Sequence, residues 1–104
     1  MPYTIELSSD AEWDLGALTR FEVVAVRQAL PVYLRNQPDV PTRRRKRMDP
    51  NPVGATWALR LDELRVYYDI DQEAGIVRVL RVGRKVREQV TLRGVVTDMR
   101  EAMD

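Results

Sequence analysis

The pattern of apolar and polar residues near the N-terminus changes from the period of a strand to that of two helices. Residues 3–7 alternate between apolar and polar side chains, which is typical of a half-buried strand. Residues 9–12, Ser-Asp-Ala-Glu, have the sequence of a capping box and predict a short helix. A second capping box at residues 19–22, Thr-Arg-Phe-Glu, predicts a longer helix that ends near Asn36. We therefore expect a strand followed by a hairpin of two helices.

The expected buried faces of the two helices follow from apolar residues at helical spacing. In the first helix these residues are Ala11, Trp13, Leu15 and Leu18. In the second they are Phe21, Val24, Ala25, Ala29, Val32 and Tyr33. Val23, Val26 and Leu30 lie on the other side of the second helix, and they indicate either a wide buried stripe or a docking surface. Pro31 falls inside this helix and predicts a kink or an early end.

The second half of the chain has the pattern of short strands. Residues 37–52 contain four prolines and no periodicity, so they predict a loop held across the surface. Residues 56–61 and 64–70 then alternate, with Asp62-Glu63 as a tight link, and predict two strands.

A third strand is predicted at 76–82, interrupted after Val82 by Gly83, and a further edge strand at 86–92. The tail, residues 95–104, is expected to be a short amphipathic helix or frayed.

These elements predict one α+β domain over residues 1–104, with the helical pair on one face of a three- to four-stranded antiparallel meander. Strand alternation directs one set of side chains toward the helices: Trp57, Leu59, Leu61, Leu64, Val66 and Tyr68. The other set, Arg60, Arg65 and Tyr67, points away from the helices. We expect Arg84 and Lys85 to lie close to that second face.

Composition excludes several classes of site. The 104 residues include no cysteine and no histidine, which removes disulfides, thiolate nucleophiles, serine–histidine triads and most transition-metal sites. We expect no metal and no cofactor. No apolar run approaches the about 20 residues that span a bilayer, and the N-terminus has no signal-peptide pattern, so we expect a cytoplasmic protein without membrane contact.

Positive charge is concentrated in two blocks, although the net charge is only +1. Residues 43–47, Arg-Arg-Arg-Lys-Arg, are all basic, and residues 76–93 contain six basic side chains and one acidic side chain. Two basic blocks that meet on one surface attract phosphate backbones. The alternative is that each block is a solvated face.

Residues 56–85, TWALRLDELRVYYDIDQEAGIVRVLRVGRK, resemble the central signature of the RelE/ParE toxin superfamily. In that superfamily a strand ending in Leu-Arg precedes a short turn, an Arg-x-x-Tyr strand, an acidic turn, an apolar strand and a glycine followed by basic residues. The N-terminal strand, the two helices and the proline-containing loop fit the same layout, so the resemblance covers about residues 2–92.

The resemblance implies that the chain is the toxin of a type II toxin–antitoxin system. The partners that it implies are a cognate antitoxin in a hetero-oligomer, the ribosome and mRNA. It implies a metal-independent endoribonuclease whose catalytic cations are Arg65, Arg84 and Lys85, which stabilise the charge that develops when a ribose 2′-OH attacks the phosphate. Further RNA-binding residues would be Arg43, Arg44, Arg45, Lys46, Arg47, Arg60, Tyr67 and Arg87. Arg60 would hold Asp62 or a phosphate, Tyr67 would stack on a base, and Tyr68 would belong to the core.

The chain departs from the nuclease pattern at three positions. The tyrosine that nuclease members carry near the C-terminus is matched by Thr91. The two lysines that they carry in the strand before the Arg-x-x-Tyr strand are matched by Thr56 and Ala58. Lys46 is a candidate substitute base. Two alternatives therefore stay open, which are a ParE-like inhibitor of DNA gyrase and a non-catalytic member of the superfamily.

Overall fold

The computed structural model describes residues 2–103 and contains two helices and a seven-stranded sheet. The helices are α1 (Ser9–Gly16) and α2 (Arg20–Leu34). The strands are β1 (Thr4–Leu7), β2 (Arg45–Arg47), β3 (Trp57–Leu61), β4 (Leu64–Asp71), β5 (Ile76–Val86), β6 (Gln89–Leu92) and β7 (Val95–Thr97). Strands β2 to β7 form an antiparallel meander in chain order, and β1 lies parallel to β5. The α+β class and the order of elements are confirmed.

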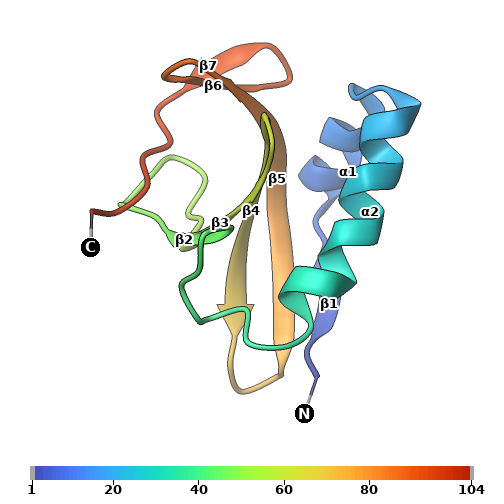
Figure 1. The fold of residues 1–104 in the computed structure, drawn as a ribbon, viewed down its shortest axis with the longest axis vertical. Helices are drawn as coiled ribbons and strands as arrows, with labels where there is room; N and C mark the ends of the chain where they lie inside the picture. The colour runs from blue at the N-terminus through green and yellow to red at the C-terminus, as the bar shows by residue number, and fades with distance from the viewer. Residues whose placement is uncertain (1, 104) are drawn as a thin grey trace.

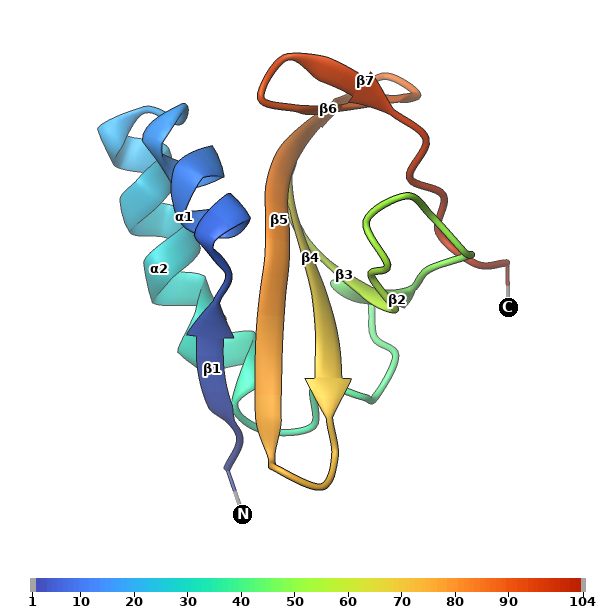
Figure 2. The ribbon, with the colours of Figure 1, turned by 180° about the vertical axis from the view of Figure 1, so that it is seen from behind.

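The two faces of the sheet have different covers (Figures 1 and 2). Helices α1 and α2 pack on one side, here called the helix face. The part of the chain between β2 and β3, residues 48–56, and the C-terminal segment, residues 98–102, lie on the opposite side, here called the tail face. No helix within residues 2–103 is long and apolar enough to cross a membrane.

Each face has its own apolar cluster. The helix-face cluster contains, among others, Leu15, Val26, Leu59, Val66 and Tyr68, all buried. The smaller tail-face cluster consists of Ala55, Ala58, Tyr67, Val90, Leu92 and Met99. The predicted alternation of β3 and β4 is therefore confirmed, because their helix-facing residues all pack in or against the first cluster.

The first helix begins one residue earlier than its capping box predicts. Ser8, not Ser9, is the N-cap, and its Oγ accepts a hydrogen bond from the Ala11 N–H at 3.0 Å. The same hydroxyl donates to the Leu80 carbonyl of β5 at 2.8 Å. This hydrogen bond to the sheet explains why Ser8 is the N-cap and not Ser9. The local sequence does not indicate it, because Leu80 lies far along the chain. The second capping box, Thr19 with Glu22, forms as predicted.

The predicted buried face of α2 is only partly correct. Ala29 is buried and Tyr33 packs against the helix-face cluster, as predicted. Phe21 and Val32 are 84% and 69% exposed, whereas Val26 and Leu30 are buried and Val23 is partly buried. In α1, Trp13 is likewise 69% exposed. Val23, Val26 and Leu30 therefore form a buried stripe and not a docking surface. Several apolar residues that were predicted to be buried are instead exposed to solvent. Both stripes have helical spacing, so periodicity alone cannot choose between them.

Helix α2 continues past Pro31 and ends at Leu34. Pro31 and Arg27 both lie on the exposed side of the helix. The Arg27 carbonyl that loses its partner there is accessible to water, which lowers the cost of the proline.

Three predictions for the second half of the chain need correction. The basic run is partly a strand, β2, which pairs with β3 through Arg45 to Arg47. The tail is neither a helix nor frayed, because β7 pairs with β6 and Glu101 forms a bridge with Met48.

Strand β5 continues through Gly83, which does not break it. A Cβ at Gly83 would lie 2.5 Å from the Thr91 carbonyl oxygen, so this glycine allows β6 to approach β5 closely.

Candidate anion-binding site

Two arginines face each other across the β3–β4 hairpin on the tail face. Arg60 and Arg65 are directly opposite partners in the antiparallel register, and Asp62-Glu63 forms the predicted two-residue link between the strands. Directly opposed like charges destabilise a sheet unless an anion compensates them. The hairpin therefore creates a place for an anion.

Glu101 of the C-terminal segment supplies that negative charge. Arg60 binds its carboxylate through two nitrogens, with Nε donating to Oε2 at 3.0 Å and Nη2 donating to Oε1. The Nε of Arg65 lies 4.0 Å from Oε2, beyond hydrogen-bonding distance. Arg60 thus holds Glu101, and not Asp62 as expected from the sequence.

Arg65 is the more buried member of the pair, with a side chain 12% exposed. Its Nη1 donates to the carbonyls of Asp62 and Leu64, which fixes the guanidinium over its own hairpin. Its Nε is buried and has no hydrogen-bond partner among the described residues. An unsatisfied buried N–H of a cation costs free energy and is available to an anionic ligand.

The charges of this cluster are coupled. Burial alone would raise the pKa of the Glu101 carboxyl, but the hydrogen bond from Arg60 and the charges of Arg60, Lys85 and Arg65 outweigh it and hold that pKa below its usual value. Burial lowers the pKa of Arg65, against the attraction of Glu101. The hydrogen bond to Glu101 raises the pKa of Arg60. All three groups are charged at neutral pH.

Two lysines lie on the same face. Lys85 is the register partner of Val90, which belongs to the tail-face cluster, and it lines a hollow of about 520 Å³ together with Glu101. Lys46 is the register partner of Ala58 and therefore also points to the tail face. The tail face thus carries Lys46, Arg60, Arg65 and Lys85, and sequence reasoning correctly grouped Arg65 with Lys85.

Arg84 does not join this group, contrary to the expectation from the sequence. It is the register partner of Leu64, whose side chain packs in the helix-face cluster, so Arg84 points to the side opposite Arg65. There its guanidinium binds both carboxylate oxygens of Glu22 in α2. The hydrogen bond from Arg84, followed by that from the Thr19 N–H, lowers the pKa of Glu22 to about 2. Alternation along β5 makes it impossible for adjacent Arg84 and Lys85 to share a face.

The basic run of residues 43–47 is divided by the same alternation. Arg45 braces the loop after α2, donating from Nε to the Val40 carbonyl and from Nη1 to the Tyr33 carbonyl, both at 2.9 Å. Arg47 lies over the Trp57 ring, 5.4 Å from its centroid. These two arginines hold the fold on the helix side of β2.

Arg43 and Arg44 are exposed beside a hollow of about 520 Å³ that also contains Arg60 and Tyr33, and Arg44 lies 5.3 Å from the centre of the Tyr33 ring. Arg87 is exposed in the turn between β5 and β6.

The two adjacent tyrosines of β4 are both buried. Tyr67 lies on the tail face as predicted, but it is 2% exposed and packs in the cluster with Met99. It is therefore not open to a base in this structure. Tyr68 belongs to the helix-face core as predicted, where it stacks on Trp57 and donates to the Pro38 carbonyl at 2.7 Å.

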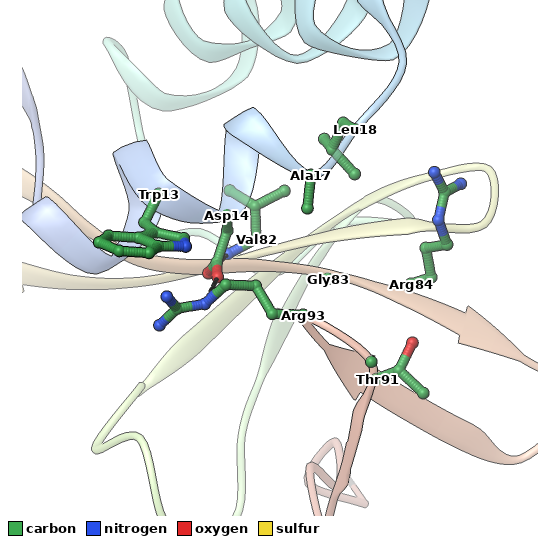
Figure 3. A pocket seen from close by; sticks show the side chains of 10 residues that line it. Trp13, Asp14, Ala17, Leu18, Val82, Gly83, Arg84, Thr91 and Arg93 are labelled. Atoms are coloured by element: carbon green, nitrogen blue, oxygen red, sulfur yellow. Dashed lines mark hydrogen bonds and ion pairs between the residues drawn. The ribbon is translucent and has the colours of Figure 1, made fainter.

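A second buried carboxylate, Asp14 of α1, was not singled out from the sequence (Figure 3). It is 1% exposed and accepts hydrogen bonds from Arg81 at 2.7 and 3.1 Å and from the Val82 N–H at 2.9 Å. Arg93 lies 3.0 Å from its Oδ1 and covers the Trp13 ring. In Figure 3 the Arg84 guanidinium extends away from this group. Asp14 thus joins α1, β5 and the turn after β6.

Glu101 was also missed. Its only sequence signal is indirect, since the opposed Arg60 and Arg65 require an anion that the hairpin itself lacks. Nothing in residues 98–104 indicates which carboxylate supplies it.

The fold has a counterpart among solved structures. The crystal structure of the toxin–antitoxin complex RelBE2 from Mycobacterium tuberculosis contains a chain that superposes with a TM-score of 0.70 and 28% sequence identity. The match covers 82% of this chain and 93% of that chain. The chain has the fold of the RelE/ParE superfamily. No family model and no curated protein sequence matches the chain. The superfamily resemblance of residues 2–92 is therefore confirmed by three-dimensional structure.

Proposed function

We propose that the protein is the toxin of a toxin–antitoxin pair and that it cleaves mRNA on the ribosome in the cytoplasm. The observation that carries this proposal is the opposed guanidinium pair of Arg60 and Arg65, with Lys85 beside it, on the tail face of a RelE-type sheet. These cations come from three neighbouring strands, and their backbones are fixed by continuous pairing from β3 to β5.

The reaction that suits this site is attack of a ribose 2′-oxygen on the adjacent phosphorus. The new 2′-O–P bond forms as the P–O5′ bond breaks, which leaves a 2′,3′-cyclic phosphate and a free 5′-hydroxyl. The 2′-OH proton passes to water, and the leaving 5′-oxygen takes a proton from water. Fixed guanidinium groups stabilise the negative charge that accumulates on the phosphoryl oxygens.

The ribosome supplies what the chain lacks. The sequence contains no histidine, and Thr91 stands where nuclease relatives carry a tyrosine, so acid–base assistance from the protein is limited. Correct alignment of a nucleophile with the reacting atom lowers the activation free energy by several kcal/mol, and by about 7–11 kcal/mol in favourable cases. Holding the mRNA in the ribosomal A site gives the 2′-oxygen that alignment.

Expression of the wild type and Arg65→Ala in growing cells tests this function. We expect the wild type to arrest growth and to produce transcripts cut within translated regions, and cleavage of purified mRNA to require ribosomes. Arg65→Ala should remain folded by circular dichroism and should not arrest growth. Intact transcripts together with inhibition of gyrase supercoiling would instead identify a gyrase inhibitor and contradict the proposal.

The partner proposed for this toxin is an antitoxin, because the matched structure is a toxin–antitoxin complex. Its docking site would include the exposed apolar residues Phe21 and Val24 at the start of α2. Phe21 borders a hollow of about 540 Å³ that Ala25, Leu61 and Leu64 also line. An apolar residue of an antitoxin helix or extended segment fits such a hollow.

Co-purification with the product of the neighbouring gene tests this partner. Phe21→Asp should weaken the complex, and Glu73→Gln, at the exposed turn between β4 and β5, should leave it intact. A complex that is insensitive to Phe21→Asp would exclude this docking site, whereas the nuclease proposal would be unaffected.

A further inference from the structure

The C-terminal segment, residues 98–102, covers the anion-binding site described above. Its backbone is paired with the chain just after β2, since the Asp49 N–H donates to the Arg100 carbonyl at 2.9 Å and the Ala102 N–H donates to the Arg47 carbonyl at 2.8 Å. Met99 is 7% exposed and packs in the tail-face cluster. This docking brings the Glu101 carboxylate to the arginines.

The covered groups are those that the proposed function needs. With the C-terminal segment in place, Arg65 is 12% exposed and Tyr67 is 2% exposed. In this arrangement the Tyr67 ring is closed to a base, and the buried Nε of Arg65 is out of reach of an RNA phosphate. Substrate binding and docking of the segment therefore exclude each other.

We infer that the C-terminal segment is a self-inhibitory strap, in which Glu101 occupies the position that a phosphodiester of the RNA substrate takes in the active state. This inference rests on the proposed function. Carboxylates and phosphates bind arginine through the same paired N–H···O contacts, so one can replace the other.

The fit of Glu101 is incomplete in a way that favours a phosphate. The planar carboxylate satisfies Arg60 through both oxygens but stays 4.0 Å from the Arg65 Nε, which has no other partner. A phosphodiester presents two charged and two ester oxygens in a tetrahedral arrangement. It can therefore accept from Arg60 and from the orphaned Arg65 Nε at the same time.

The strap is also short enough to be displaced. The backbone pairing found for it consists of two hydrogen bonds, which together form the bridge between Met48 and Glu101. Segments with few backbone hydrogen bonds open at a small fraction of the global unfolding free energy. Binding of the substrate, or of the ribosome, can thus supply the free energy that opens it.

Two substitutions in the full chain loosen the strap by different means. Glu101→Gln removes the negative charge, and Ala102→Pro removes the N–H that bonds to Arg47 while leaving Glu101 unchanged. Glu73→Gln is the matched control, because it changes the net charge equally at an exposed turn remote from the site. Circular dichroism verifies that each variant is folded.

The first measurement is binding of a short single-stranded RNA with 2′-O-methyl groups, which cannot be cleaved, by fluorescence anisotropy. We expect both strap variants to bind the RNA about tenfold more tightly than the wild type. This factor follows if the strap is docked in roughly nine of ten wild-type molecules, so that only about one in ten can bind RNA. Glu73→Gln should bind like the wild type. Equal affinities of all four proteins, or gains matched by Glu73→Gln, would overturn the inference.

The second measurement does not depend on the function. Hydrogen exchange should show protection of the Ala102 amide in the wild type and its loss in Glu101→Gln. An unprotected amide in the wild type would overturn the inference even if the protein is a nuclease. Cleavage lost in Glu101→Gln at unchanged RNA affinity would also overturn it, because Glu101 would then act in catalysis. Failure of the proposed function is recognised separately, by wild-type protein that cuts no ribosome-bound mRNA.

Discussion

Each face of the sheet has a carboxylate that binds arginines, Asp14 on the helix face and Glu101 on the tail face, and the two differ in how completely their partners are satisfied. On the helix face, Asp14 receives hydrogen bonds from Arg81 and the Val82 N–H and an ion pair from Arg93. On the tail face, Glu101 leaves the Nε of Arg65 without a partner. Complete satisfaction is typical of groups that hold a fold together, and an unsatisfied buried group calls for an explanation, such as a ligand.

The segments that pack on the two faces of the sheet also differ in how extensively they cover it. Two helices cover the helix face over a large apolar cluster, whereas the tail face has a smaller cluster covered by the segment before β3 and by residues 98–102. We conclude that the helix face stabilises the protein and that the tail face is built to be opened.

The largest effect on stability should come from the helix-face core. Leu59 is fully buried there, so Leu59→Ala should lower the free energy of unfolding by about 4 kcal/mol. Met99→Ala on the tail face should cost much less, because the C-terminal segment can detach while the sheet stays folded. Urea denaturation of both variants measures the difference. Equal losses would show that the two faces unfold as one unit and would contradict the comparison.

The next largest effect should come from Asp14. Asp14→Asn leaves Arg81 and Arg93 facing a neutral side chain and should cost about 3 kcal/mol. The value is at the low end for buried pairs because the two arginines are 19% and 31% exposed. Asp10→Asn is the control, since Asp10 is 66% exposed and its single contact with Arg93 is long, at 3.4 Å. We expect a change within 0.5 kcal/mol for the control, roughly the usual range for surface substitutions.

A smaller, pH-dependent effect should come from Glu22 and Arg84. The hydrogen bond from Arg84 lowers the pKa of Glu22 from 4.5 to about 2 on folding. A carboxyl whose pKa falls on folding stabilises the protein above its unfolded pKa, and this contribution is lost as the pH drops toward 2. Glu22→Gln should thus be about 1 kcal/mol less stable than the wild type at pH 7. Thermal denaturation should show the gap closing between pH 4.5 and 2, and a gap that persists at pH 2 would contradict the assignment.

The sequence predicted the elements whose signals are local. Alternation in residues 56–61 and 64–70 defined β3 and β4 with their faces, and the Thr19 capping box located the start of α2. It failed where distant contacts decide. Ser8 caps α1 because its hydroxyl also reaches β5, and β2 forms because β3 offers it an edge.

Of the candidate site, strand alternation correctly placed Arg60 and Arg65 together, but the same rule applied to β5 separates Arg84 from Lys85. The alternation rule applies to Arg84 and Lys85 only because β5 continues through Gly83. The sequence predicts a strand break at this glycine, so the rule was not extended to them. The position of Glu101 depends on how the chain returns across the tail face, and the local pattern of residues 95–104 predicted a helix or a frayed end instead.

The account depends most on the claim that RNA phosphates are handled on the tail face, and cleavage of ribosome-bound mRNA by purified protein tests it directly. Arg65→Ala should reduce the cleavage rate by about 10²–10³, as expected for removal of one preorganised donor. Arg84→Ala, which removes the same charge from the opposite face, should cleave at close to the wild-type rate once its loss of stability is taken into account. A folded Arg65→Ala protein that cleaves as fast as the wild type, or an equal loss in Arg84→Ala, would contradict the account.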